Sequence, residues 1–523
     1  MVLPAPPSTA ARLPWKRLAL LLFATAVLRG FLILAPPDDF FENGAVPHEE
    51  LLRGIAAQEL VDGPVAPIQR YQVNNFWGGS LFVSAVAAVP YAVLGPKLVV
   101  LRAVALLFGL GCVALLFVLL HRHAGSRAAW IGGSLLAFAP PGYALSSCTL
   151  YGTHLEANLI ALLLVALVLE EARAVRRGPW TVALGFTAGF ALWFGFSLLV
   201  PVGVWLVLEF ARDRAFLARR RGLVLALAFL VGLAPWIRYQ LVHGWSGFQI
   251  YHEGLVGHLV QGLERGGAGE KLVVTFARLA PMSACFRDTL PIAGIWAGRV
   301  LLLLAGAAAV RAAWISRAEL AALVRGAVLG RAGAHPTPAV FALLFLVAFV
   351  ASYALSRFDV ATRDWIFDYR YLMPPVPFAC LLAGVAGAEL ARRTSASRIA
   401  VTATVVVVCA ACAWSTARQA APERFHDNLE APGTSRSQLV RFLARTFGPE
   451  PEPAAEVALR ILERRDPELA RELLAGFGRG IRGLLALPGD LPEDVRRREL
   501  CRRTLAVVEE HLPPEAARVF RGE

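Results

Sequence analysis

Acidic residues gather near the start of the chain, in the polar segment at residues 37–63. A carboxylate can accept a proton from a hydroxyl group as the hydroxyl oxygen attacks an electrophile, so such a cluster is a candidate source of a general base. From residue 49 to residue 60 apolar side chains recur at helical spacing, which predicts an amphipathic helix. Glu49 is the candidate base on this helix. A solvated loop with capping acids is the alternative, and it is the simpler interpretation for Glu42 and Glu50.

A second ionisable pair, His154 and Glu156, stands at the start of an apolar run in the sequence YGTHLEANLIALLL. Charged groups at the mouth of such a helix must face protein or water. Binding of a substrate hydroxyl is one role for this pair. A carboxylate at a helix N-terminus is also favoured by the helix dipole alone, so capping remains the alternative.

A third polar segment, SRFDVATRDWIFDYRYLMPPVPF, alternates arginines with aspartates beside aromatic residues. A guanidinium group binds phosphate oxygens through two parallel hydrogen bonds. Arg363, Arg370 and Tyr371 are therefore candidates for binding a phosphate group. The aromatic residues also suit an interfacial belt at a membrane surface.

Between these segments the chain is strongly apolar. It is 57% hydrophobic and 17% charged, with a mean hydropathy of +0.56, whereas an ordinary soluble domain has about 25% charged residues. Its apolar runs are close to the length that a membrane-spanning helix needs. They lie at about residues 18–36, 77–94, 98–120, 128–147, 155–169, 180–196, 198–211, 222–242, 291–310, 338–356, 371–391 and 399–416.

The charge distribution sets the expected topology. The net charge of +13 comes mostly from arginines in short loops between apolar runs, so membrane lipids are the expected partner and nucleic acid is not. If every run crossed the membrane with the N-terminus inside, the basic loops would lie outside, against the positive-inside rule. Treating 77–94 as an interfacial or re-entrant segment places them inside. We prefer this to an outside N-terminus, which would misplace Arg12, Lys16 and Arg17.

The predicted fold is thus an all-α, multi-pass protein of the inner (plasma) membrane, with about eleven transmembrane helices. Residues 1–417 form the membrane domain, and its first outer loop, 37–97, contains an interfacial helix. Residues 418–523 are richer in charge and form a small, soluble, mainly helical tail on the outer face. Four cysteines lie within apolar runs and are expected to be buried thiols rather than disulfides: Cys112, Cys380, Cys409 and Cys412.

Several motifs, in order, resemble those of the GT-C class of membrane glycosyltransferases, which includes protein O-mannosyltransferases and lipid A aminoarabinose transferases. PHEELLRGIAAQELVDG is similar to the first-loop pattern of that class, a Pro-Asp-Glu followed by an interfacial helix and a closing glycine. VLGPKLVVLRAVALLFGLG, LAPWIRYQLVHG and RYLMPPVPFACLLAG resemble its later motifs. The resemblance covers about residues 30–390.

The resemblance implies transfer of a sugar from a polyprenyl-phosphate carrier to a glycan, lipid or protein acceptor on the outer face. His48 falls on the acidic position of the first-loop motif and Glu49 on the next, so the implied base is Glu49 or Asp39. Glu156 falls on the second acidic position and Arg370 on the phosphate-binding arginine. In that class a basic residue often follows a Pro-Pro in the first loop. The corresponding stretch here, NNFWGGSL, has no lysine, so the resemblance implies that other groups bind the donor phosphate.

The expected reaction is a single displacement with inversion, without a metal ion or other cofactor. Glu49 or Asp39 acts as base, while Glu156 and His154 position hydroxyl groups, His48 contacts substrate, and Arg370, helped by Arg363, binds the departing phosphate. The alternative is a transporter or flippase for a lipid-linked saccharide, for which mid-membrane charges such as Arg29 and Arg102 would be the sign. A docking protein built around the tail is a third possibility.

Overall fold

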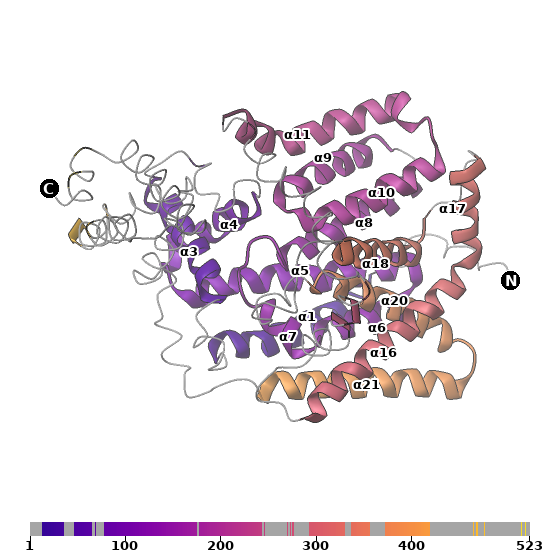
Figure 1. The fold of residues 1–523 in the computed structure, drawn as a ribbon. Coiled ribbons are helices and arrows are strands. Elements are labelled where there is room, and N and C mark those ends of the chain that lie inside the picture. The colour runs from indigo at the N-terminus through magenta and orange to yellow at the C-terminus, as the bar shows by residue number, and fades with distance from the viewer. Residues whose placement is uncertain are drawn as a thin grey trace, which may run out of the picture. The chain divides into compact units, whose positions relative to one another are not determined.

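The structure of the protein is a computed structural model. It describes residues 13–35, 46–64, 78–174, 177–242, 292–329, 336–355 and 372–418, with isolated residues elsewhere. Within the described ranges the regular elements are all helices (Figure 1). The all-α prediction is therefore confirmed for this part of the chain.

Six helices of the described part are long and apolar enough to cross a membrane. They are α1 (Trp15–Leu34), α5 (Leu98–Ala124), α11 (Arg220–Val242), α16 (Ile292–Ile315, apolar over Trp296–Ile315), α18 (Pro338–Leu355) and α21 (Ser395–Arg418). Two further apolar helices are shorter, α4 (Gly79–Leu94) and α20 (Pro375–Leu390). The protein is a multi-pass membrane protein, and the predicted count of about eleven spans is not confirmed.

The remaining helices are shorter or carry charges at their ends. They are α3 (Val46–Asp62), α6 (Ser126–Ala137), α7 (Pro141–Ser146), α8 (Glu156–Arg173), α9 (Gly178–Phe194), α10 (Leu199–Arg212) and α17 (Arg317–Leu329). The run at 128–147, predicted as one span, is two helices, α6 and α7. Pro140 and Pro141 lie at this break, where proline cannot donate the backbone hydrogen bond that would continue α6.

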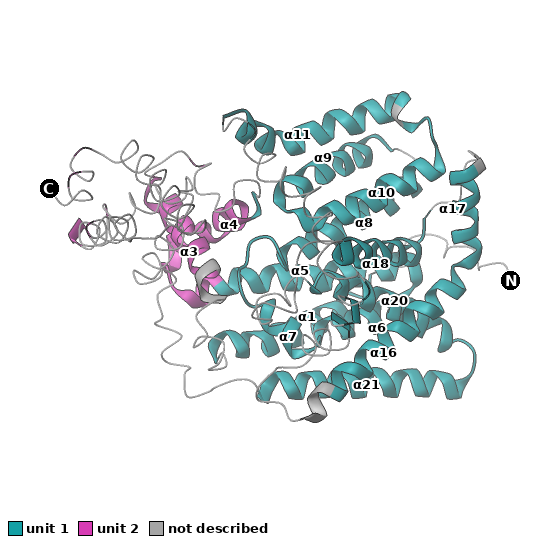
Figure 2. Ribbon diagram, in the orientation of Figure 1, with its two compact units in different colours: residues 1–43, 75–79, 102–428 teal, residues 44–74, 80–101, 429–523 magenta. Residues whose placement is uncertain are grey.

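The chain divides into two compact units (Figure 2). Unit 1 comprises residues 1–43, 75–79 and 102–428, and contains most of the membrane helices. Unit 2 comprises residues 44–74, 80–101 and 429–523, and contains α3 and nearly all of α4.

Helices α9 and α11 of unit 1 run side by side at the top of Figure 1 and pack through glycines. A Cβ atom at Gly189 would lie 2.0 Å from the carbonyl oxygen of Phe229, and one at Gly232 would lie 2.1 Å from that of Phe186. Only hydrogen fits at these positions. Small residues allow such close backbone contact between helices in a membrane, where van der Waals packing drives association.

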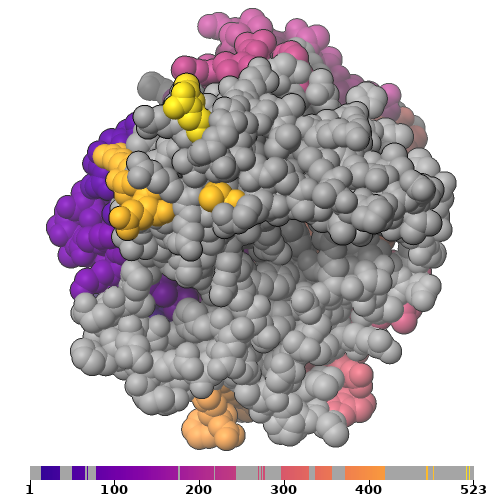
Figure 3. Space-filling model, turned by 60° about the vertical axis from the view of Figure 1, so that its left-hand side comes forward, coloured from indigo at the N-terminus to yellow at the C-terminus, as the bar shows by residue number. Residues whose placement is uncertain are grey.

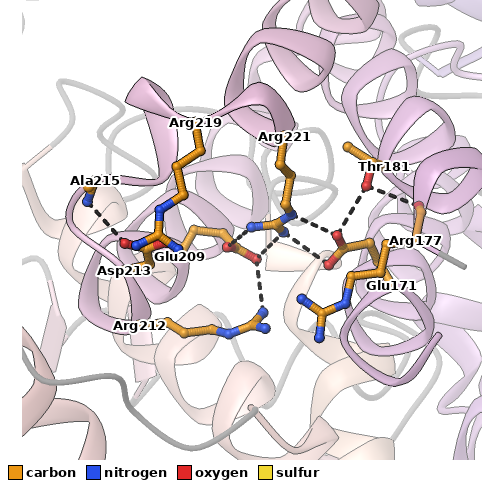
Figure 4. Close-up of polar contacts among 9 residues, drawn as sticks. All are labelled: Glu171, Arg177, Thr181, Glu209, Arg212, Asp213, Ala215, Arg219 and Arg221. Atoms are coloured by element: carbon orange, nitrogen blue, oxygen red, sulfur yellow. Dashed lines mark hydrogen bonds and ion pairs between the residues drawn. The ribbon is translucent and has the colours of Figure 1, made fainter. Parts of the chain in front are cut away.

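The charged ends of α8, α10 and α11 are joined by an ionic cluster, formed by Glu171, Glu209, Arg212 and Arg221 (Figure 4). Arg221 Nη1 donates to Glu209 Oε2 at 2.7 Å, and Thr181 Oγ1 of α9 donates to Glu171 Oε1 at 3.1 Å. Both glutamates are buried. The cluster fixes the ends of four helices at the face where the sequence predicts the cytoplasm.

The predicted thiols are confirmed. The five cysteines that the structure describes are buried thiols outside any disulfide: Cys112, Cys148, Cys380, Cys409 and Cys412.

Candidate functional site

The helix predicted in the first outer loop is present as α3, Val46–Asp62. Leu51, Ile55 and Ala56 are buried, as predicted, but the charged residues Arg53 and Glu59 are buried as well, so α3 is covered on more than its apolar face. His48 and Glu49 lie in its first turn, although the described side chains of α3 begin at residue 50. The expectation for Glu50 as a solvated or capping acid is wrong, because its side chain is fully buried.

The C-terminal end of α3 is held by a residue from the tail. Gly63, the closing glycine, has a φ of +91°, a left-handed conformation typical of the residue after a helix. Arg464 donates hydrogen bonds from Nη1 to the Gly63 oxygen at 2.8 Å and from Nη2 to the Asp62 oxygen at 3.0 Å. Its Nη1 also lies 3.7 Å from Glu59 Oε2. In Figure 3 the orange atoms of the tail accordingly border violet atoms from the start of the chain.

In unit 1, the connection between α7 and α8 is buried although it is not helical. From Ser147 to Leu155 every residue is buried, including the polar residues Thr149, Thr153 and His154. Buried backbone polar groups outside helices need hydrogen-bond partners from protein or from ordered water. His154 packs its ring edge-to-face on Tyr151, with centroids 5.9 Å apart. This buried junction is the candidate site of unit 1.

Glu156 is the first residue of α8 and is 1% exposed. Its carboxylate therefore lies at the positive end of the helix dipole, where negative charge is favoured. It lines a cavity of about 10 Å³ with residues of α5 and α7, among them Gly109, Cys112 and Tyr143. That volume holds about one water molecule. The cavity therefore has room for one hydroxyl group or water molecule beside Glu156, and not for a whole sugar ring.

Arg29 of α1 belongs to the same region. Its side chain is fully buried, and Nη2 donates to the Leu136 oxygen at the end of α6 at 3.0 Å. The guanidinium carbon lies 6.0 Å from the ring centre of Tyr143. A Cβ atom at Gly109 would lie 2.5 Å from Arg29 Nη1. Arg29, Gly109, Tyr143 and Glu156 therefore form a buried polar cluster contributed by α1, α5, α7 and α8.

The start of α4 is packed tightly against this junction. A Cβ atom at Gly79 would lie 2.4 Å from the oxygen of Gly152 and 2.5 Å from that of Phe194. The backbone N–H of Gly78 donates to the Trp193 oxygen at 2.7 Å. The backbones of three segments distant in sequence, at residues 78–79, 152 and 193–194, are therefore in direct contact near His154 and Glu156.

The structure describes some of the predicted site residues and not others. His154 and Glu156 are brought together at the buried junction, and Glu49 and His48 lie on α3. Asp39, Arg363, Arg370 and Tyr371 lie outside the described residues. Among described residues, no group of three or more His, Cys, Asp and Glu side chains is placed to bind a metal ion.

Sequence reasoning named Arg29 only as a mid-membrane charge and did not identify Tyr143 or Asn158. Asn158 Nδ2 donates to the Tyr143 hydroxyl at 3.4 Å, and both residues are buried. A buried arginine in an apolar span must face polar protein groups, so Arg29 was the available signal. Its neighbours come from helices more than 70 residues away in sequence, which no local pattern reveals.

Comparison with known proteins found no matching family model and no matching curated sequence. Solved structures do match. ArnT from Cupriavidus metallidurans bound to undecaprenyl phosphate is 16% identical, with a TM-score of 0.50, over 97% of this chain and 90% of that one. Its apo form is 17% identical, with a TM-score of 0.49, over 96% and 89%.

The oligosaccharyltransferase of Archaeoglobus fulgidus, in a complex with zinc and sulfate, is 13% identical with a TM-score of 0.45. That match covers 84% of this chain and 57% of the oligosaccharyltransferase. At these identities the likeness concerns the fold alone. The chain is an all-helical membrane protein similar in fold, over nearly its whole length, to ArnT, one of the GT-C membrane glycosyltransferases.

Proposed function

We propose that the protein transfers a sugar from a polyprenyl-phosphate carrier to an acceptor hydroxyl on the outer face of the membrane. The observation that carries this proposal is a buried carboxylate, Glu156, at a non-helical junction in a chain with the fold of ArnT. The ArnT structure of that comparison was bound to undecaprenyl phosphate. A lipid-linked phosphate is therefore the donor chemistry that the fold favours.

In the proposed reaction, the acceptor oxygen attacks the anomeric carbon of the sugar as its proton passes to a carboxylate, Glu49 or Asp39. The bond from the anomeric carbon to the phosphate oxygen breaks, with inversion, and the polyprenyl phosphate leaves with the bonding electrons. Arg370 and Arg363 stabilise the charge that develops on the phosphate, and Tyr371 lies beside them in sequence. Preorganised cations have their greatest effect in such poorly solvated sites.

The other roles follow from position. Glu156 and His154 bind hydroxyl groups of donor or acceptor, and His48 contacts substrate next to the base. The buried residues of α3 and its contact with Arg464 hold this helix in a fixed conformation, which supports a role for the acidic residue of its first turn.

The test is made in cells that depend on the protein, by mass spectrometry of cell-envelope glycans. Glu49→Gln and Arg370→Ala are expected to remove the mass of one sugar from a glycan product. General acid–base catalysis contributes about 10²- to 10⁴-fold to rate, and loss of one group that stabilises developing charge costs about 10²- to 10³-fold. Glu42→Gln, a nearby acid without an assigned role, is the matched control. Full product in both test variants, at normal expression, excludes these assignments.

The base is assigned by a second comparison. Retained product in Glu49→Gln together with loss in Asp39→Asn moves the base from Glu49 to Asp39. Loss in Glu49→Gln alone assigns it to Glu49.

A further inference from the structure

A pocket of about 630 Å³ lies in unit 1, away from the buried junction, between α1, α6 and α21. Four arginines line it and no acidic residue does: Arg17 of α1, Arg127 of α6, Arg392 after α20 and Arg398 of α21. Its volume is in the range of small-molecule binding sites. The concentration of positive charge is unexplained by the proposed reaction, because these helix ends lie on the face predicted to be cytoplasmic.

Two of the four arginines form hydrogen bonds to backbone carbonyl groups, and the other two can bind a ligand. Arg127 Nη1 donates to the Ala391 oxygen at 3.3 Å, and Arg392 Nη2 donates to the Ala124 oxygen at 3.5 Å. These bonds satisfy carbonyl groups at the ends of α20 and α5 and so fix the pocket wall. Arg17 and Arg398 are exposed, and within the described part of the chain their side chains form no ion pair. Their charges are therefore free to bind an anion.

The pocket changes character along the helices. On α21 the lining residues are Arg398, then Thr402, then Val405 and Val406. Eight residues of helix from Arg398 to Val406 span about 12 Å. On α6, Ser126 and Arg127 are followed by Trp130, Ile131 and Ser134 in the same order. A charged end therefore continues into a wall that is apolar on α21 and mainly apolar on α6, which matches a phosphate headgroup followed by the start of an acyl chain.

We propose that this arginine pocket binds the phosphate headgroup of an anionic phospholipid of the cytoplasmic leaflet, with one acyl chain along Val405 and Val406. Basic pockets between transmembrane helices on the cytoplasmic side are suited to such headgroups. The bound lipid joins α1, α6 and α21, which come from both ends of the membrane domain. It is distinct from the polyprenyl-phosphate donor, which the proposed reaction places on the opposite face.

The test is native mass spectrometry of the purified full-length protein after exposure to phosphatidylglycerol and phosphatidylcholine with identical acyl chains. The wild type is expected to retain phosphatidylglycerol preferentially. R17Q/R398Q is expected to lower that preference about tenfold or more, since each arginine near a lipid surface contributes several-fold in affinity. R220Q/R325Q removes the same charge from exposed positions outside the pocket and is expected to retain the preference.

A second pair of variants keeps all charges. Thr402→Trp fills the pocket and is expected to abolish the preference, whereas Thr404→Trp adds the same bulk to an exposed residue of α21 that does not line it. Equal behaviour of the two tryptophan variants, or equal loss in both arginine pairs, overturns the site in favour of a diffuse charge effect. Displacement of the lipid by millimolar inorganic phosphate, at constant ionic strength, overturns the lipid assignment in favour of a free phosphate.

Discussion

Arg221 binds the carboxylate of Glu171 through two hydrogen bonds, from Nε to Oε1 at 2.7 Å and from Nη2 to Oε2 at 2.9 Å. The same guanidinium binds Glu209, so one arginine of α11 pairs with buried acids of α8 and α10 (Figure 4). This relationship makes the helix ends interdependent. It also explains why acids are found at the otherwise basic face that the sequence predicts to be cytoplasmic.

Removing Arg221 leaves two buried carboxylates without their principal cation. Arg221→Gln is expected to lower the free energy of unfolding by about 3–5 kcal/mol, the usual cost of breaking a buried ion pair. Arg219→Gln, which breaks a pair with Asp213 at 3.0 Å whose arginine is 66% exposed, is the control and is expected to cost less than about 1 kcal/mol. Thermal unfolding in detergent measures both. Equal costs would show that the cluster does not stabilise the fold.

The glycine contact between α9 and α11 predicts a sharp steric effect. Gly189→Ala places a methyl group 2.0 Å from the Phe229 oxygen, so the two helix backbones must separate. We expect a loss of about 1–3 kcal/mol, typical of overpacking. Gly203→Ala in α10 meets no atom within 4 Å and is expected to be neutral or stabilising. A neutral Gly189→Ala by the same unfolding measurement contradicts the packing of α9 on α11.

The contact of Arg464 with α3 predicts that the tail stabilises this helix. Arg464→Ala removes two donors from the last carbonyl groups of the helix, at Asp62 and Gly63. Hydrogen exchange of backbone amides in α3 is expected to become faster, by about fivefold or more for a lost contribution near 1 kcal/mol. Arg518→Ala, a tail arginine with no described contact to α3, is the control. Unchanged exchange in Arg464→Ala rules out this role for the tail.

The buried polar cluster predicts an effect at Gly109 on the junction that carries Glu156. Gly109→Ala places a Cβ atom 2.5 Å from Arg29 Nη1 and must displace the guanidinium. Gly109→Ala is expected to reduce the amount of glycan product strongly, because Arg29 and Glu156 flank the same buried region. The melting temperature is expected to change little. Gly306→Ala in α16, with no atom within 4 Å, is the control. If Gly109→Ala yields as much glycan product as Gly306→Ala, the buried polar cluster has no role in the reaction.

Much of the helical architecture was predictable because it depends on local hydropathy. The bounds of α1, α11 and α18 agree with the predicted runs to within a few residues. The break between α6 and α7 was missed, because the residues around Pro140 are as apolar as those of a continuous span. Hydropathy measures which residues avoid water and carries little information on where a helix stops.

The candidate site was predictable only in part. The helical pattern identified α3, and the placement of an acid at the start of an apolar run identified Glu156. The burial of Glu50 was not foreseen, since an acid beside other acids has the pattern of a solvated surface. The pairing of Arg221 with Glu171, 50 residues away in sequence, depends on how α8 and α11 pack and leaves no trace in either segment.

The central claim is most directly tested by purified protein in liposomes containing one radiolabelled polyprenyl-phosphate sugar at a time, with a cell-envelope extract as acceptor. The account predicts that one donor in the panel loses its sugar to the acceptor, and that Glu49→Gln and Arg370→Ala slow this transfer at least about 100-fold. Movement of an intact lipid-linked saccharide across the bilayer, without transfer from any donor, would contradict the account and establish a transporter instead.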